Sequence, residues 1–305
     1  MAYREIDFNL SKETQAMHRE AQRFAREVMR PVGIELDKLA NPEDVYAQGS
    51  PLWDVYKTYR EFDLHLQNMP EDFGGMAGTL DPMASYLISE EMGYGDAGLA
   101  ISLGASGMPF NFAAIFSHVP ELKQIDMDYC NDREGKMIGC WGIIEPDHGG
   151  DWSLGGDDPK CGPSVRGVLK GDEYIVNGEK AAWVSNCTIA THCVLHVGLD
   201  PSRCMQGQGI AIIPLDLPGI SRGAPLNKMG QRALNQGSIV FQDARIPKQY
   251  MIIEPSEPGV DDGQGERFMA APMGMGVTFA GLAKAAYDEA FNYANERIQG
   301  GVPIF

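Results

Sequence analysis

A change of hydrophobic period near residue 136 constrains the fold of this chain more than any other feature. Before it, apolar residues recur every three or four positions, as on one face of a helix. After it, short apolar runs alternate with turn residues until about residue 252, and a helical period then returns. This order predicts an α+β protein with segregated layers, and it argues against an alternating βαβ nucleotide-binding fold.

The first region, from Phe8 to about Leu122, reads as helical. Ser11 is a suitable N-cap for a first helix that we expect to end near Pro31. A second helix is expected directly after Asp81, because the proline that follows it favours a first helical turn. The proline and glycines of residues 69–75 predict a loop between the two helices.

The middle region predicts a β-rich, barrel-like domain. Its apolar runs, each bounded by turn residues, are KMIGCWGII, SVRGVL, EYIV, THCVLHVGL, GIAIIPL and SIVFQDARI. The pair Asn177-Gly178, between EYIV and KAAWVS, predicts a tight hairpin turn with positive φ. We expect an N-terminal helical domain over 1–135, the β domain over 136–252, and the start of a carboxy-terminal helical domain over 253–305.

The third region begins with an acidic linker, EPSEPGVDDGQG, and continues as a helical pattern from about Glu266 to Ile298. The apolar face of this predicted helix consists of Phe268, Met275, Phe279, Leu282, Ala286 and Phe291. The chain stops at Phe305 in the apolar run GVPIF, which leaves the helix short of packing partners. We therefore expect a truncated chain, one half of a split pair, or an incompletely represented protein.

The charge balance limits the possible partners. The chain has 42 Asp and Glu against 25 Lys and Arg, a net charge of −17, and this field repels nucleic acid and anionic membranes. We therefore expect no nucleic-acid partner and no membrane insertion. An anionic ligand would need individually placed arginines or lysines to overcome the repulsion.

Cysteine usage and the amino terminus point to a cytoplasmic protein. The six cysteines form no CxxC pair, so we expect free thiols in a reducing compartment and no metal site. The sequence MAYREIDFNLSKETQ has no apolar core of a signal peptide.

Two segments could carry chemistry. Residues 143–151, IIEPDHGGD, end a predicted strand with adjacent glycines whose N–H groups could cradle an anion or a ring, although a simple β-turn has the same composition. Trp183 and Ser185 lie two positions apart on a predicted strand, so both side chains share one face. An indole and a hydroxyl there could serve one planar ligand, although a buried structural Trp is the simpler alternative.

Taken together and in this order, the segments resemble the acyl-CoA dehydrogenase family from Phe8 to the last residue. The stretches that carry the resemblance are FNLSKETQ, MPEDFGG, EEMGYGDAGLA, IIEPDHGGD, NGEKAAWVSN, MGQR before SIVFQDARIP, and YANERIQGGVPI. The resemblance implies a flavoprotein with FAD between the β domain and the helices. It also implies α,β-dehydrogenation of an acyl-CoA to a 2-enoyl-CoA, with electrons passed to an electron-transferring flavoprotein.

The resemblance also implies roles for individual residues. Trp183 would stack on the flavin and Ser185 would hydrogen-bond near its N5. Arg267 would contact CoA. The remaining cofactor contacts implied are Trp141, Ile143, Ile144, Gly149, Gly150 and Val184, and Gly150 would also contact substrate. Arg297 and Gln299 match a motif that reaches the FAD of a neighbouring subunit, which implies a homo- or hetero-oligomer, either a dimer or a tetramer.

The catalytic base is the sharpest question. In some family members the base directly precedes the arginine that corresponds to Arg267, and here that residue is Glu266. Most other members take the base from a later segment that this sequence does not contain. An acidic residue at the start of a helix also has a simpler explanation, a favourable interaction with the helix dipole.

Departures from the family pattern keep other readings open. Ile144 stands where the family usually has Ser or Thr, and Gly150 stands where it has Ser, so two side-chain hydrogen bonds are missing. The run Arg297-Ile-Gln-Gly-Gly301 replaces a motif with an aromatic residue. The alternatives are a flavin oxidase or monooxygenase on the same fold, and a non-catalytic partner subunit of a hetero-oligomeric dehydrogenase.

Overall fold

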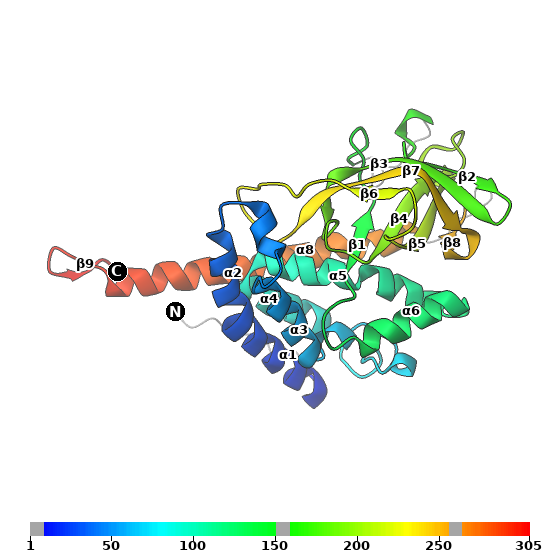
Figure 1. Cartoon of the computed structure of the whole chain (residues 1–305). Helices are drawn as coiled ribbons and strands as arrows, with labels where there is room; N and C mark the ends of the chain where they lie inside the picture. Colours follow the sequence, from blue (N-terminus) through cyan, green and yellow to red (C-terminus); the bar gives the residue numbers. More distant parts are fainter. Residues whose placement is uncertain (1–8, 151–158, 256–263) are drawn as a thin grey trace.

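The computed structural model describes residues 9–150, 159–255 and 264–305 (Figure 1). Phe8, Asp151 and most of the acidic linker lie outside these residues. Helices form one layer of the molecule and a twisted sheet forms the other, and a long final helix runs along both (Figure 1). The predicted α+β order of helices, strands and helix is therefore confirmed.

The helical layer is built from the first half of the chain. Its α-helices are α1 (Lys12–Phe24), α2 (Arg30–Asp37), α3 (Leu52–Glu61), α4 (Ala84–Gly95), α5 (Ala97–Ile115) and α6 (Pro120–Asn131). Ser11 caps α1 as predicted, because its hydroxyl accepts a hydrogen bond of 3.2 Å from the backbone N–H of Thr14.

Two predicted helix boundaries were wrong. The first helix does not end near Pro31, because a π-helical turn (Ala25–Met29) joins α1 directly to α2 and places Pro31 in the first turn of α2, where its missing N–H costs little. The second helix does not begin directly after Asp81 but at Ala84. The Asp81 carboxylate instead accepts hydrogen bonds from the backbone and hydroxyl of Ser11, both 2.8 Å long.

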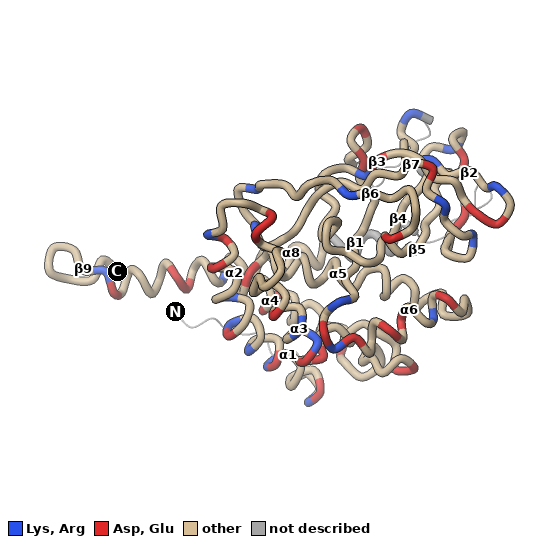
Figure 2. Tube along the Cα trace, viewed as in Figure 1, with Lys and Arg blue, Asp and Glu red and all other residues tan. Residues whose placement is uncertain are grey.

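Helix α5 is the core helix of the molecule. By length and composition it could cross a membrane, but 56% of its most apolar window is buried against the rest of the protein. It carries no charged residue and is uniformly tan in Figure 2, whereas α1 and α6 present charges to solvent. It packs against α4, α6 and strand β1, so its apolar surface lies at the junction of the two layers.

The sheet layer confirms the predicted β-rich middle region. The strands are β1 (Gly139–Gly142), β2 (Arg166–Lys170), β3 (Glu173–Ser185), β4 (His192–Gly198), β5 (Gln208–Pro214), β6 (Ile220–Arg222), β7 (Gln236–Pro247) and β8 (Met251–Ile253). In the described part of the chain they form one eight-stranded sheet in the order β6-β7-β3-β2-β4-β5-β8, with β1 added parallel to β4. Most of the other pairs are antiparallel.

The predicted hairpin at Asn177-Gly178 was wrong, because both residues lie inside the continuous strand β3. Gly178 has φ +129° and lies at a register shift between β3 and β7, so its conformational freedom serves a β-bulge. The Asn177 side chain bonds the neighbouring strand, since its Oδ1 accepts a 2.8 Å hydrogen bond from the Asp243 N–H. The hairpin turn lies instead at Gly171, between β2 and β3.

Helix α8 (Gln264–Glu296) crosses α4 at very short range. A Cβ added at Gly93 would lie 1.9 Å from the Thr278 carbonyl oxygen, and one added at Gly281 would lie 1.9 Å from the Glu90 carbonyl oxygen. The predicted apolar face is not the buried face, because Met275, Phe279 and Leu282 remain exposed while the small residues face α4. Beyond this crossing, α8 extends past the other helices and ends in a hairpin of β9 (Ile298–Gln299) and β10 (Val302–Pro303) (Figure 1).

Candidate functional site

A pocket of about 650 Å³ opens where the end of β3 meets α5 and α8. Its lining comes from β1, β3 and the turn after β1, from α4, α5 and α8, and from β7 and the segment before it. Its lining residues are Asn68, Ser89, Ala100, Ile101, Gly104, Ala105, Met108, Phe112, Trp141, Ile143, Ile144, Trp183, Val184, Ser185, Gln231, Leu234, Gln236, Gly274, Met275 and Thr278.

Trp183 and Ser185 share one wall of this pocket, as the strand alternation predicts. The Trp183 side chain is 56% exposed, which is unusual for an indole beside a protein core. Val184, between them, is buried. The alternative of a buried structural Trp is therefore wrong, and a large aromatic surface faces the pocket.

The end of β3 is fixed by a buried hydrogen-bond network centred on Asn186. This residue has φ +65°. Its side-chain amide donates a 2.7 Å hydrogen bond to the Ser102 carbonyl of α5 and a 3.2 Å hydrogen bond to the Gly139 carbonyl of β1. The Ser102 hydroxyl donates to Asn186 Oδ1 at 2.7 Å and contacts the Tyr56 hydroxyl at 2.8 Å. The network joins both layers and sets the position of Ser185.

A second tryptophan that lines the pocket, Trp141 on β1, is fixed by a hydrogen bond to His196. Its indole N–H donates 2.9 Å to Nε2 of His196, and His196 Nδ1 lies 3.0 Å from Gln208 Oε1. Burial lowers the pKa of His196 to about 3, so the ring stays neutral near pH 7. A neutral ring that accepts at Nε2 must carry its proton on Nδ1, where it donates to Gln208.

A buried ion pair lies behind the turn that begins at Ile143. Lys180 Nζ lies 2.7 Å from Glu145 Oε1 and donates 3.2 Å to the Ile143 carbonyl, and both charged side chains are at most 1% exposed. The backbone N–H groups of Ser164 and Val165 also donate to the Glu145 carboxylate. Burial lowers the pKa of Lys180, and the Glu145 carboxylate opposes that shift. The pair fastens the turn to β3.

The segment 227–236 contributes Gln231, Leu234 and Gln236 to the lining of the pocket. Arg232 anchors it to the stretch that follows α2 through hydrogen bonds to the carbonyls of Leu39 and Ala40. Arg232 also donates to Asn227 Oδ1 within the segment. Within the segment, Lys228 donates to Gln236 Oε1 at 3.0 Å. Burial lowers the pKa of Lys228 to about 8, so this lysine still carries charge near neutral pH. Sequence reasoning missed both Lys228 and Gln236, since no motif marks their contact.

The structure brings together only part of the predicted site. Six of the predicted residues line the pocket: Trp141, Ile143, Ile144, Trp183, Val184 and Ser185. Gly149 and Gly150 are exposed in the turn beyond it. Arg297 and Gln299 lie at the far, exposed end of α8 and do not line this pocket.

Two predicted residues can be placed only by their backbone. Glu266 and Arg267 lie in the first turn of α8, and their side chains fall outside what the structure describes. Two phenylalanines of α5 differ in their position. Phe112 lines the cavity, whereas Phe110 is fully buried and stacks on Tyr129 with 4.0 Å between ring centroids.

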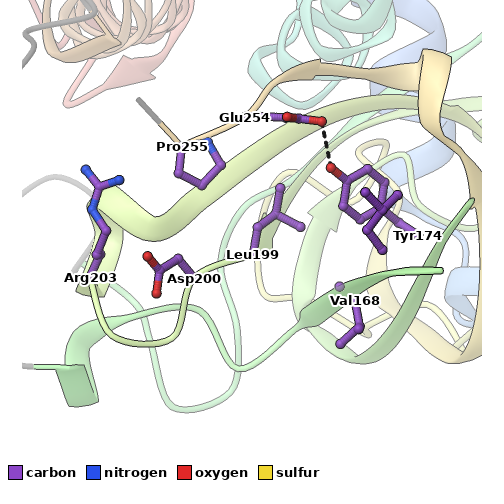
Figure 3. Close-up of a pocket in the computed structure, with 9 residues that line it drawn as sticks. Val168, Tyr174, Leu199, Asp200, Arg203, Glu254 and Pro255 are labelled. Carbon is purple, nitrogen blue, oxygen red and sulfur yellow. Dashed lines mark hydrogen bonds between the residues drawn. The ribbon is translucent and has the colours of Figure 1, made fainter. Parts of the chain in front are cut away.

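A second hollow, of about 420 Å³, lies beside β2 and the segment after β4 (Figure 3). Tyr174 and Glu254 meet at one side of it, where the phenol donates a 2.6 Å hydrogen bond to the carboxylate. Burial, followed by the Glu254 carboxylate, raises the pKa of Tyr174. Asp200 and Arg203 stand at the other side (Figure 3). The hollow shares no lining residue with the first pocket.

Comparison with known families decides what this architecture is. The model of the acyl-CoA dehydrogenase N-terminal domain matches residues 11–119, and the model of the acyl-CoA dehydrogenase middle domain matches residues 141–244. The chain belongs to the acyl-CoA dehydrogenase family. The resemblance seen in its sequence is therefore confirmed, and so is the fold that the resemblance implied.

Individual relatives agree with the family assignment. The probable acyl-CoA dehydrogenase YngJ of Bacillus subtilis is 29% identical over 98% of this chain and 73% of its own length. The structure titled as the electron transferring flavoprotein of Acidaminococcus fermentans covers 98% of this chain and 72% of that chain, with 25% identity and a TM-score of 0.77. An acyl-CoA dehydrogenase from Bacillus anthracis complexed with FAD covers 96% of this chain and 46% of that chain, with 24% identity and a TM-score of 0.75.

The chain is shorter than these proteins. It spans between 62% and 73% of the length of the curated acyl-CoA dehydrogenases that it matches, although the matches cover 92% to 98% of the chain itself.

Proposed function

We propose that this chain binds FAD and an acyl-CoA thioester and takes part in α,β-dehydrogenation of the acyl group. The observation that carries the proposal is the pairing of an exposed indole, Trp183, with a hydroxyl, Ser185, on one wall of an apolar pocket. Family membership supports the same reading.

The residues of the pocket fit an isoalloxazine ring. A flat aromatic ring system needs an apolar slot with a face to stack on, and Trp183 lines the pocket and is 56% exposed. Ser185 and Gln236 supply polar groups at the edge, while Ile143 and Ile144 line the slot with apolar side chains. Such a cavity, mostly apolar with few polar groups, is typical of cofactor sites.

Bound FAD would supply the chemistry that protein side chains lack, which is acceptance of a β-hydrogen with its electron pair. The tasks left to this chain are to orient the acyl group against the ring, to exclude water and to take up the α-proton. The exposed Met275 and the half-buried Met108 and Phe112 line the pocket from the helical side, where an acyl chain could lie.

Glu266 is the proposed base for the α-proton, and Arg267 is the proposed contact to CoA. Both lie at the start of α8, the helix that supplies Gly274, Met275 and Thr278 to the pocket. A carboxylate there would gain basicity when a bound acyl chain displaces water, as proton abstraction near neutral pH requires.

Electrons would leave through an electron-transferring flavoprotein. An oligomer is proposed because Arg297 and Gln299 lie exposed at the far end of α8, away from the pocket of their own chain. There they could reach a cofactor held by another subunit.

Anaerobic titration of the flavin-loaded chain with straight, branched and cyclic acyl-CoA thioesters tests the proposal. Bleaching of the visible flavin band by one class is the expected result, and it would name the substrate class. Bound flavin that no thioester bleaches would contradict dehydrogenation by this chain. Rapid reoxidation by air after bleaching would instead favour the oxidase alternative.

The role of Glu266 has its own test, in which flavin reduction is followed by rapid mixing in wild type and Glu266→Gln. We expect the reduction rate to fall by about 10²-fold or more, the usual contribution of a positioned base. An unchanged rate with ligand still bound would remove Glu266 from the mechanism.

A further inference from the structure

Lys228 is a half-buried cation next to the pocket wall that carries Ser185. Its ammonium donates 2.7 Å to the Leu234 carbonyl and 3.0 Å to Gln236 Oε1. Within the described part of the chain no carboxylate lies within 4.0 Å of it, in contrast to Lys180 with its Glu145 partner. The positive charge is therefore not neutralised by a neighbouring acid.

The contact with Lys228 fixes which way the Gln236 amide points. An ammonium group can only donate, so the amide oxygen of Gln236 must face it. The amide nitrogen then faces the other way, where it donates 3.2 Å to the Trp183 carbonyl and 3.3 Å to Ser185 Oγ. A carbonyl can only accept, so both ends of the amide agree on one orientation.

This orientation determines what the Ser185 hydroxyl can do. Because its oxygen accepts from Gln236, its own hydrogen is not used in that contact. Ser185 is only half-buried and lines the pocket, so the hydrogen can point into the cavity. An ammonium ion next to the amide also polarises the amide N–H groups and strengthens the chain of bonds.

We propose that Lys228 and Gln236 are positioning residues that make Ser185 a hydrogen-bond donor toward an acceptor nitrogen of the bound ring. The inference rests on the proposed function, because the acceptor is N5 of the isoalloxazine. Neither positioning residue contacts the reacting atoms. They act through the direction of one hydroxyl hydrogen. The position of that hydrogen depends on the amide of Gln236, the first residue of β7, and on the Lys228 cation from the segment before β7.

Binding of two flavins that differ at one atom tests the proposal. In 5-deaza-FAD a C–H group replaces N5, so the ring has the same shape but cannot accept a hydrogen bond there. The quantity to measure is the Kd for 5-deaza-FAD divided by the Kd for FAD, using the full chain stripped of flavin. We expect a wild-type ratio about tenfold above that of Ser185→Ala, which corresponds to one net hydrogen bond.

Gln236→Glu is the decisive variant. A carboxylate at this position keeps the size of the side chain and pairs with Lys228, but it can only accept, so the Ser185 hydroxyl must turn its hydrogen away from the pocket. The ratio should fall to that of Ser185→Ala while 5-deaza-FAD still binds, which shows that the variant is folded. Gln242→Glu makes the same change at an exposed position of β7 and should keep the wild-type ratio.

Lys228→Met should lower the ratio about threefold, because the amide of Gln236 loses the partner that fixes its orientation. A wild-type ratio in both Gln236→Glu and Lys228→Met would overturn this inference and leave the proposed function standing. A wild-type chain that binds neither flavin would overturn the proposed function itself, and with it this inference.

Discussion

Glu145 and Asp126 are both buried carboxylates, but their surroundings are opposite. Glu145, behind the pocket, is 2% exposed and is met by Lys180 and by two backbone N–H groups. Asp126, on α6, is fully buried, and neither carboxylate oxygen has a hydrogen-bond partner among the residues that the structure describes. Burial raises the pKa of Asp126 to about 8.

The difference shows how one chain handles buried acids in two ways. Near the pocket the acid is met by Lys180 and by two backbone N–H groups, and these contacts offset the cost of burial. In the helical layer the acid stays protonated at neutral pH, since a neutral carboxyl costs less to bury than an unpaired charge. A buried acid is therefore paired where the pair fastens the turn at Ile143 to β3, the strand that carries Trp183 and Ser185.

The largest expected effect is that of Lys180→Met, which leaves the Glu145 charge buried and unpaired. We expect a loss of about 3–5 kcal/mol in the free energy of unfolding. Chemical denaturation followed by circular dichroism measures it. Lys180→Met combined with Glu145→Leu removes both charges and should recover much of the loss, and a double variant as unstable as the single one would contradict this account of the pair.

The next largest effect is that Asp126 makes the stability of the fold depend on pH. A carboxyl whose pKa is about 8 in the folded state and about 4 in the unfolded state stabilises the fold at low pH, and this stabilisation is lost as pH rises through 8. Asp126→Asn removes the titration. In thermal melts the variant should gain in Tm relative to wild type between pH 6 and pH 9, and a constant difference across that range would refute the assignment.

His196 should make folding stability depend on pH to a smaller extent than Asp126 does, and with the opposite slope. Its pKa is lowered to about 3 in the fold, whereas an unfolded histidine titrates near 6.5. Stability is then lost as pH falls from about 6.5 toward 3, because the unfolded chain binds the extra proton. His196→Gln, which can still accept from Trp141, should melt with a flatter acid limb. An acid limb identical to wild type would show that His196 is not buried neutral.

The smallest expected effect on stability is that of Trp183→Ala. The indole is 56% exposed, and the Gln236 amide bonds the backbone carbonyl of Trp183 rather than its ring. We expect a change of about 0.5 kcal/mol or less in the free energy of unfolding. A loss of several kcal/mol would mean that Trp183 is a structural residue. It would contradict the view that the Lys180–Glu145 pair stabilises the wall while the Trp183 indole remains available for stacking.

Much of this arrangement could be predicted from the sequence because it depends on local pattern. The alternation along β3 places Trp183 and Ser185 on one face, and the change of period marks the two layers. The local pattern gave wrong predictions where one residue type is compatible with two local structures. Gly178 provides positive φ for a bulge rather than a turn, and a π-helical turn carries the first helix past Pro31.

The polar contacts behind the pocket could not be predicted in the same way. Lys228 meets Gln236 across a loop, and His196 meets Trp141 across two strands, so their pairing depends on tertiary register. Arg297 does not line the pocket of its own chain, and its proposed role toward a second subunit rests on the family resemblance.

The most direct test of the central claim is the affinity of the flavin-free chain for FAD, measured by fluorescence titration in wild type, Trp183→Ala and Trp53→Ala. Trp53 lies on α3 and does not line the pocket, so it serves as the matched control. We predict tight binding in wild type, a loss of about tenfold or more in Trp183→Ala, and little change in Trp53→Ala. Equal affinity in all three proteins would contradict the claim that FAD stacks on this wall.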